Sequence, residues 1–130
     1  MDRVTGRILI VDDEPPLLKM MSLFLGRLGY SVTTAQTTEK AWAEVEAAPG
    51  EFACAVVDAT MAGLSMRDLA LKLLAASPSM CVLAASGYPV DMSEMQAEAP
   101  GRVDFLHKPF TPEMLAAAVR RMLAPQEENL

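Results

Sequence analysis

Three carboxylates stand side by side where an aliphatic run ends. Residues 8–11 read ILIV, and Asp12, Asp13 and Glu14 follow directly. Carboxylates usually scatter over a protein surface, because burying or crowding them is costly. Two unit charges ~5 Å apart repel by about 3 kcal/mol at an effective dielectric of about 20. The cluster therefore predicts a cation nearby, although Glu14 by itself also fits the start of a helix, where acids are favoured.

Three further polar groups stand where apolar runs end. Asp58 closes the run FACAVV, Ser86 follows residues 80–85, and Lys108 follows the run that begins at Val103. An aspartate can attack phosphorus as a nucleophile and form an aspartyl phosphate. A cation and a lysine can neutralise phosphoryl oxygens, and a serine hydroxyl can donate to one of them. Oxygen ligands without Cys or His favour Mg²⁺ over zinc, so the set predicts a Mg²⁺-dependent phosphoryl-acceptor site.

An alternation of apolar runs and helical patterns must position these groups. The expected strands are residues 7–11, 31–35, 52–59, 80–85 and 103–106. A helical pattern follows each strand, which predicts an α/β fold with a parallel sheet and helices on both faces. In such sheets the ligand crevice lies beyond the carboxyl ends of the strands. We therefore expect the polar groups to meet at one rim, although they are scattered along the chain.

The expected helices have recognisable ends. Prolines open the first helix and Gly29 can close it, Thr37 or Thr38 can cap the second, and Ser65 with Asp68 resembles a capping box for the third. Residues 91–99 form a weak fourth helix with few apolar anchors, and Thr111-Pro112-Glu113 opens the fifth. We expect one domain over residues 1–125 and a disordered tail over 126–130.

Composition narrows the class of protein. The chain has 130 residues, of which 52% are hydrophobic, and this suits one domain with one core. The net charge of −6 argues against nucleic-acid binding through a basic face. No apolar run approaches the ~18 residues of a membrane helix, and the first residues lack the apolar region of a signal peptide. We expect a cytoplasmic protein in which Cys54 and Cys81 are buried thiols.

The motifs VDDE, VVDATMAG, AASG and FLHKPF, in this order, resemble the receiver domain of two-component response regulators. The resemblance extends from Arg7 to about Leu123. It implies a CheY-like, flavodoxin-like (βα)5 three-layer sandwich, whose five parallel strands have the order 2-1-3-4-5. The SGYP segment and the weak fourth helix are more similar to receivers attached to hybrid sensor kinases.

The resemblance implies a set of metal and phosphate ligands. Asp58 corresponds to the phosphoacceptor. Asp13 corresponds to the acid that binds Mg²⁺ directly, and Asp12 to its partner, which often acts through water. Asp58 and the backbone carbonyl of Thr60 correspond to the remaining protein ligands of the metal.

The remaining site residues are assigned in the same way. Ser86 corresponds to the hydroxyl residue that turns toward the phosphoryl group, and Lys108 to the lysine that holds it. The Lys108–Pro109 bond is typically cis in the family. Phe105 corresponds to the aromatic residue that moves inward with Ser86. Read without the resemblance, Phe105 is a core aromatic, Ser86 an ordinary turn residue and His107 a solvent-facing strand residue.

Two positions depart from the family. Ala62 stands where the family usually has proline, and Met66 where it usually has glycine. Both belong to the loop after the third strand, so we expect that loop to be looser or differently shaped. Neither change removes a group from the expected chemistry.

The implied function is a phosphorylation-dependent switch rather than a conventional enzyme. A sensor histidine kinase or a phosphotransfer domain would donate a phosphoryl group to Asp58, and slow hydrolysis would later remove it. The face formed by helix 4, strand 5 and helix 5 would then engage a downstream protein or a second copy. The residues after Leu123 leave no room for a DNA-binding output domain, so we expect output by protein contact, through another chain, or through a part of a longer protein that this sequence does not include.

Two other hypotheses stay open at this point. One is a receiver-like binding module that acts without phosphorylation, although such domains usually lose an acid or the lysine. The other is a small hydrolase of the haloacid-dehalogenase type, which also uses an aspartyl nucleophile. That class needs a second aspartate two residues after the nucleophile, where this chain has Thr60.

Overall fold

The computed structural model describes residues 6–60 and 65–128, with side chains described as far as Leu123. Strands and helices alternate along the described residues. The strands are β1 (Arg7–Val11), β2 (Ser31–Ala35), β3 (Phe52–Asp58), β4 (Cys81–Ser86) and β5 (Val103–His107). The helices are α1 (Pro15–Arg27), α2 (Thr38–Ala47), α3 (Met66–Ala76), α4 (Ser93–Glu98) and α5 (Pro112–Glu128).

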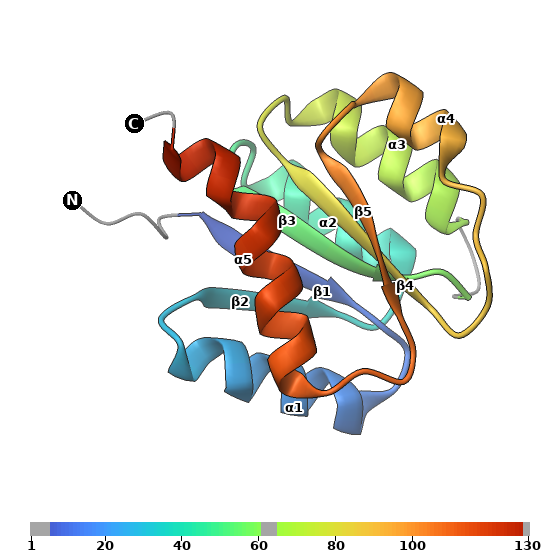
Figure 1. The fold of residues 1–130 in the computed structure, drawn as a ribbon. Helices are drawn as coiled ribbons and strands as arrows, with labels where there is room; N and C mark the ends of the chain where they lie inside the picture. The colour runs from blue at the N-terminus through green and yellow to red at the C-terminus, as the bar shows by residue number, and fades with distance from the viewer. Residues whose placement is uncertain (1–5, 61–64, 129–130) are drawn as a thin grey trace.

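The strands form one parallel sheet in the order β2-β1-β3-β4-β5. Helices α1 and α5 cover one face of the sheet, and α2, α3 and α4 cover the other (Figure 1). The three layers follow from the connections, because each right-handed crossover places its helix on a face of the sheet. The predicted fold and strand order are therefore confirmed.

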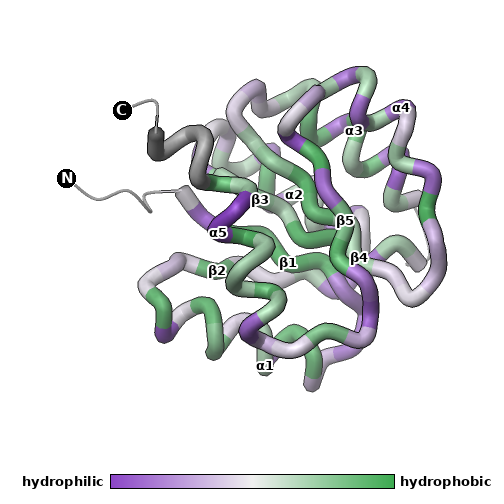
Figure 2. Tube along the Cα trace, in the orientation of Figure 1, coloured by the Kyte–Doolittle hydropathy of each residue, from purple (hydrophilic) through white to green (hydrophobic). Residues whose placement is uncertain are grey.

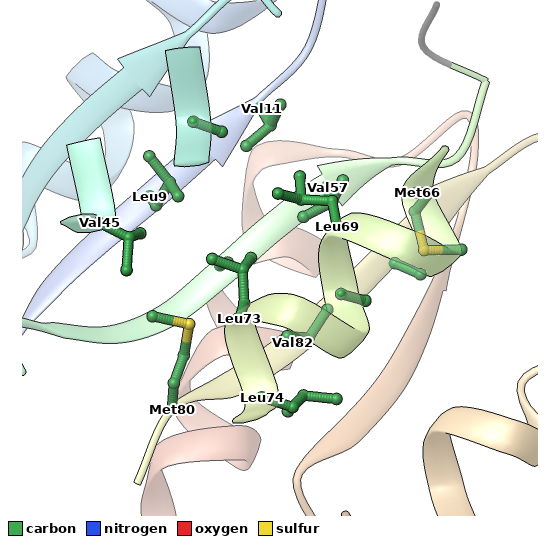
Figure 3. Close-up of a cluster of buried hydrophobic side chains, with 14 of the residues drawn as sticks. Leu9, Val11, Val45, Val57, Met66, Leu69, Leu73, Leu74, Met80 and Val82 are labelled. Carbon is green, nitrogen blue, oxygen red and sulfur yellow. The ribbon is translucent and has the colours of Figure 1, made fainter. Parts of the chain in front are cut away.

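Each face of the sheet has its own hydrophobic layer. Along β1, Leu9 and Val11 pack toward α2 and α3 in the first hydrophobic layer, whereas Ile8 and Ile10 pack toward α1 and α5 in the second. Burial on both faces explains why the central strands read as continuous aliphatic runs, and Figure 2 shows these strands as mostly hydrophobic. Helix α3 lies over the sheet in the first layer, with Leu69 and Leu73 directed toward β3 (Figure 3).

Helix ends agree closely with the sequence signals. The hydroxyl of Thr37 accepts a hydrogen bond from the Lys40 amide at 3.0 Å, which begins α2. The hydroxyl of Ser65 accepts from the Asp68 amide at 3.1 Å, which begins α3. Gly29 follows α1 with a φ of 102°, in the left-handed region where glycine is favoured.

Helix α4 is shorter than expected. It begins at Ser93, whereas the sequence suggested a start at Asp91. The Asp91 carboxylate accepts hydrogen bonds from the amide and the hydroxyl of Ser93, at 3.0 Å and 2.6 Å. These bonds hold the pKa of Asp91 below its usual range. They also form a turn at Asp91, so this residue precedes the helix instead of being its first residue.

Helix α5 is longer than expected. It continues to Glu128, beyond the boundary expected at residue 125. Residues 129–130 of the expected tail lie outside the described residues. The helices of the described part of the chain all lack the combined length and hydropathy that crossing a membrane requires.

Cys54 and Cys81 are buried thiols on neighbouring strands, as expected. Burial raises the pKa of Cys54 well above its ordinary value, and the nearby Cys81 adds to this effect. Trp42 of α2 packs against the first hydrophobic layer, and the ammonium of Lys72 lies 4.5 Å from the centre of its ring. Both features belong to the packing between elements.

Candidate metal and phosphoryl site

Four strands deliver the candidate residues to one edge of the sheet. Asp12 follows β1, Asp58 ends β3, Ser86 ends β4 and Lys108 follows β5. These strand ends lie at the same edge of the molecule (Figure 1). In β1, β3 and β4 the polar residues begin where the buried apolar segment ends, whereas β5 (VDFLH) already carries Asp104 before Lys108 follows it.

Backbone hydrogen bonds hold the loops of this edge in register. The amide of Ala59 donates to the carbonyl of Ala85 at 2.8 Å, and the amide of Lys108 donates to the carbonyl of Ser86 at 2.8 Å. Each bond continues the strand pairing one residue past a strand end. The residues that follow β3 and β5 are therefore placed by the sheet itself, and this limits their freedom to move apart.

Three carboxylates form a cluster at this edge. One oxygen from each of Asp12, Asp13 and Asp58 lies within 4.8 Å of the others. Asp12 and Asp58 are 2% and 4% exposed, while Asp13 is exposed. Oxygen atoms alone at this spacing fit a hard divalent cation such as Mg²⁺, which prefers carboxylate and carbonyl ligands. The residues present are therefore suited to hold the metal that the sequence analysis expects.

Lys108 joins two of these carboxylates. Its ammonium lies 3.1 Å from Oδ2 of Asp12 and 3.4 Å from Oδ2 of Asp58. Burial alone would lower the pKa of Lys108, but the hydrogen bond to Asp12 and the negative charges of Asp12 and Asp58 together raise it. The lysine thus stays protonated at neutral pH and compensates part of the repulsion between the acids.

Asp58 is held by a contact that the sequence analysis missed. Its Oδ1 atom accepts hydrogen bonds from both the amide and the hydroxyl of Thr60, at 3.1 Å and 3.0 Å. Only the backbone carbonyl of Thr60 had been assigned a role. An Asp followed two residues later by Thr is a known signal for such a local side-chain turn, so the pattern could have been found. The two bonds orient the carboxylate, whose Oδ2 atom faces Lys108.

Ser86 at the end of β4 and Phe105 within β5 have different settings. Ser86 is buried, and its hydroxyl accepts a hydrogen bond from the amide of Tyr88 at 2.9 Å. Phe105 is half-buried and meets the ring of His107 edge to face, with 6.2 Å between ring centres. His107 is exposed, as expected. The switching roles of Ser86 and Phe105 stay predictions.

The structure also bears on the unusual positions of the chain. The Lys108–Pro109 bond is cis, as expected from the resemblance. Met66 begins α3 and is buried in the first hydrophobic layer, so its side chain contributes to packing. Ala62 lies outside the described residues.

The arrangement can support a specific kind of chemistry. A buried carboxylate at Asp58 is oriented by Thr60, flanked by two further acids and approached by one ammonium. Such a group can act as a nucleophile toward phosphorus if a cation and the lysine neutralise the incoming oxygens. His107 lies on β5 and is exposed to solvent. The cluster of Asp12, Asp13 and Asp58 offers a metal oxygen donors alone.

Comparisons with known proteins agree with this geometry. The family model described as the response regulator receiver domain matches residues 8–120. The response regulator GtcR of Aneurinibacillus migulanus is 31% identical over 116 residues, which are 89% of this chain and 47% of GtcR. The transcriptional regulatory protein FixJ of Bradyrhizobium diazoefficiens is 29% identical over 123 residues, 94% of this chain and 58% of FixJ. The chain thus spans about half the length of these relatives.

Solved structures show the same fold. A CheY-like receiver domain protein from Methanospirillum hungatei JF-1 has a TM-score of 0.83 and 27% identity, covering 96% of this chain and 98% of its own. A receiver domain protein from Clostridium thermocellum has a TM-score of 0.81 and 21% identity, covering 96% of this chain and 99% of its own.

Proposed function

Because this chain belongs to the family of response regulator receiver domains, we propose that it takes a phosphoryl group from a phosphohistidine onto Asp58. The observation that carries the proposal is the convergence of Lys108 on Asp12 and Asp58 within 3.4 Å, beside a three-carboxylate cluster. The donor would be a sensor histidine kinase or a phosphotransfer domain. The chain would catalyse only its own phosphorylation and dephosphorylation, in the cytoplasm.

The residues at this edge of the sheet would have different roles in metal binding and phosphoryl transfer. Asp12, Asp13, Asp58 and the backbone carbonyl of Thr60 would hold Mg²⁺, which would neutralise negative charge on the phosphoryl oxygens. A carboxylate oxygen of Asp58 attacks phosphorus, the new P–O bond forms, and the P–N bond of the donor breaks with its electron pair passing to the imidazole nitrogen. The contact of Lys108 with Oδ2 of Asp58 supports the proposal that its ammonium would hold a phosphoryl oxygen.

The phosphorylated state would act through nearby elements. Ser86 would exchange its bond with the Tyr88 amide for one to the phosphoryl group, and Phe105 would move inward. The face formed by α4, β5 and α5 would then change and engage a downstream protein or a second copy. The chain spans only about half the length of relatives such as FixJ. Control of a downstream output by this face is therefore likewise proposed for this chain.

Mass spectrometry after phosphodonor treatment tests the proposal. The chain is incubated with acetyl phosphate and Mg²⁺, and its intact mass is compared with that of Asp58→Asn, which keeps the shape of the side chain. We expect the parent chain to gain one phosphoryl group that hydroxylamine removes, and the variant to gain none. An unchanged mass in the parent chain would contradict the proposal and favour a binding module that acts without phosphorylation.

A stable phosphoryl mimic gives an independent measurement. The DrrB receiver domain, 28% identical to this chain with a TM-score of 0.75, has been solved in a BeF3-activated form. We expect beryllofluoride with Mg²⁺ to shift the amide resonances of the α4–β5–α5 face in this chain. Asp58→Asn provides the control, and its spectrum is expected to stay unchanged.

A further inference from the structure

The outer edge of β2 presents backbone groups that the sheet leaves unpaired. In the described part of the chain, β2 is an edge strand and pairs with β1 alone. The Ala35 carbonyl accepts from the Asp12 amide at 3.1 Å, so the backbone polar groups of Ala35 are directed at β1. Neighbouring residues of a strand direct these groups to opposite edges. Val32 and Thr34 therefore direct their amides and carbonyls away from β1, where another strand could pair with them.

The sequence of β2 does not protect this edge. The strand reads SVTTA, so it contains no charged residue and no proline. Its pairing with β1 is regular from Arg7↔Ser31 to Val11↔Ala35, without a bulge that would turn the edge away. Charges, prolines and bulges are the usual means by which proteins prevent pairing at an edge, and β-branched residues favour it. The outer edge of β2 is therefore suited to accept a further strand.

A groove of about 380 Å³ opens beside this edge, and we call it the β2 groove. Val32 packs in the second hydrophobic layer, so Thr34, two positions later, lies on the same α1 face of the sheet. The groove is separate from the acid cluster and from Lys108, and β5 and α5 contribute nothing to its lining. That lining includes Leu18, Lys19 and Leu23 of α1, Thr34 of β2 and Lys40 of α2.

The charge of the β2 groove is opposite to that of the chain. The chain has 17 acidic and 11 basic residues, but the described residues that line the groove include Lys19 and Lys40 and no acid. The ammonium of Lys40 lies 3.1 Å from the Glu44 carboxylate in an exposed pair. Exposed pairs contribute little to stability, so Lys40 can exchange Glu44 for another carboxylate. The charges of the groove thus complement an acidic occupant.

A second copy of the chain fits this groove poorly. Two β2 edges that paired with each other would bring Lys19 and Lys40 of one copy close to the same two lysines of the other copy. Like charges repel across such a contact. An acidic segment of a different protein has no such cost.

The two lysines approach the groove from different faces of the sheet. Lys19 belongs to α1 and Lys40 to α2, and these helices cover opposite faces (Figure 1). The side chains of an added strand alternate between the same two faces, so two adjacent acids can contact one lysine each. Leu23 is 52% exposed and lies four residues after Lys19, about 6 Å along the helix. Two strand residues span about 6.6 Å, so an apolar side chain two positions from the first acid can contact Leu23.

We propose that the outer edge of β2 and the β2 groove bind an extended acidic segment of a partner protein. The segment adds a strand to the sheet through the backbone groups of Val32 and Thr34. Backbone hydrogen bonds supply affinity in this mode of recognition, and the side-chain contacts supply specificity. The inference goes beyond the proposed function, because it requires neither Mg²⁺ nor phosphorylation of Asp58.

Three short peptides test the proposal. The first consists of threonine and valine with two adjacent glutamates at its centre, and it is blocked at both ends. The second has glutamine in place of both glutamates. The third keeps the glutamates but has N-methyl groups on both of their amides. Adjacent amides point to opposite edges of a strand, so these groups obstruct whichever edge would face β2.

Binding is measured by titrating each peptide into the parent chain in EDTA, without a phosphodonor. The amide resonances of Val32 and Thr34 are followed, together with the hydrogen exchange rate of the Thr34 amide. The same titrations are made with Lys19→Gln and Lys40→Gln. Arg120→Gln is the matched control, because it removes one positive charge from an exposed position of α5 outside the groove.

We expect the acidic peptide to bind saturably and to slow exchange of the Thr34 amide. Each lysine variant should weaken binding about threefold, and the glutamine peptide should bind about tenfold more weakly than the acidic one. Added salt should also weaken binding of the acidic peptide. The N-methylated peptide should leave Thr34 exchange unchanged, and Arg120→Gln should bind as the parent chain does.

Several outcomes would overturn the proposal. One is no binding of the acidic peptide, and another is binding that leaves Thr34 exchange unchanged, since the edge would then be unpaired. Equal binding of the acidic and glutamine peptides, or equal affinity in both lysine variants and the parent chain, would remove the role of charge. Lys19 and Lys40 are exposed, so their replacement leaves the core intact, and thermal unfolding checks that the variants fold.

The measurement is independent of phosphoryl transfer. Because binding is followed without Mg²⁺ and without a phosphodonor, its failure would leave the proposed function standing. A parent chain that gains no phosphoryl group from acetyl phosphate would likewise leave this inference standing.

Discussion

Lys108 has a part in both the stability and the proposed chemistry of the site. Its ammonium is the positive charge that contacts the buried Asp12 and Asp58. Removing one partner of a buried ion pair costs ~3–5 kcal/mol when the remaining charge cannot be solvated. The Lys108 side chain is 22% exposed, so water reduces this cost. The residue should therefore matter for folding as well as for phosphate binding.

The pH dependence of stability checks this contribution. The pKa of Lys108 in the folded chain lies above its ordinary value of 10.5. A group with a raised pKa stabilises the fold below its unfolded pKa, and this stabilisation is lost as pH rises through the folded pKa. We expect Lys108→Met to lower the free energy of unfolding by about 2 kcal/mol between pH 7 and 9.

The difference between Lys108→Met and the parent chain should shrink as pH rises above 10.5. Urea unfolding at a series of pH values measures it. Lys19→Met, which removes an exposed lysine from α1, is the control. A difference that stays constant to high pH would show that the charge of Lys108 is not its source.

Asp13 should favour metal binding at the expense of stability. It is the exposed member of a cluster whose oxygens lie within 4.8 Å of each other. Without a cation, its charge repels Asp12 and Asp58. We expect Asp13→Asn to raise the free energy of unfolding in EDTA by about 1 kcal/mol, because water screens the exposed group.

Urea unfolding in EDTA measures the effect of Asp13→Asn. Glu46→Gln on α2 removes the same charge from an exposed position outside the cluster, and its stability should match that of the parent chain. An Asp13→Asn chain that is less stable than the parent would mean that repulsion does not dominate at this edge.

At the level of the elements, α4 is held to α3 by side chains. The guanidinium of Arg67 makes two hydrogen bonds of 2.7 Å to the carboxylate of Glu94, in a bidentate pair across the helices. Helix α4 itself spans only Ser93–Glu98 and has one buried residue, Met95. The side-chain amide of Gln96 also donates to the carbonyl of Val103 on β5, at 2.8 Å. With so few contacts, the Arg67–Glu94 pair should influence how often α4 opens.

Hydrogen exchange tests this role of Arg67. We expect Arg67→Gln to speed the exchange of α4 amides such as those of Gln96 and Ala99, which are bonded to Met92 and Met95. Arg121→Gln breaks a comparable exposed pair with Asp104 on α5 and β5, and α4 exchange should be unaffected there. Added salt should act on the parent chain in the same direction as Arg67→Gln. Equal exchange of α4 in all three chains would contradict the role.

The sequence predicted the elements well because their signals are local or periodic. Aliphatic runs identify buried strands, and the caps at Thr37 and Ser65 are set by residues three positions apart. The convergence of Asp12, Asp58 and Lys108 follows from parallel strand topology. The Thr60 hydroxyl bond and the Arg67–Glu94 pair depend on loop geometry and rotamers, which periodicity does not describe.

At the level of the whole molecule, the acid cluster and Lys108 depend on three of the four strands that form the site. The carboxylates lie at the ends of β1 and β3, Lys108 follows β5, and 96 positions separate Asp12 from Lys108. An unfolded chain therefore has no preformed cluster, and a cation that binds only the folded chain stabilises it. Folding and metal binding should be thermodynamically linked.

Thermal unfolding with and without Mg²⁺ measures this linkage. At a free concentration tenfold above the dissociation constant, binding contributes about 1.4 kcal/mol. For a chain of this size that corresponds to a rise in Tm of about 5 °C. Asp13→Asn should show little of this rise, and Glu46→Gln all of it. An equal rise in all three chains would place the metal elsewhere.

The position of Lys108 after the last strand has a consequence for biosynthesis. A ribosome releases β1 and β3, with their acids, before it has made the lysine. Until β5 docks against β4, the nascent polypeptide has carboxylates at this edge but lacks the ammonium that offsets them. The ion pairs of Lys108 with Asp12 and Asp58 can therefore form only late in synthesis, after β5 has been made.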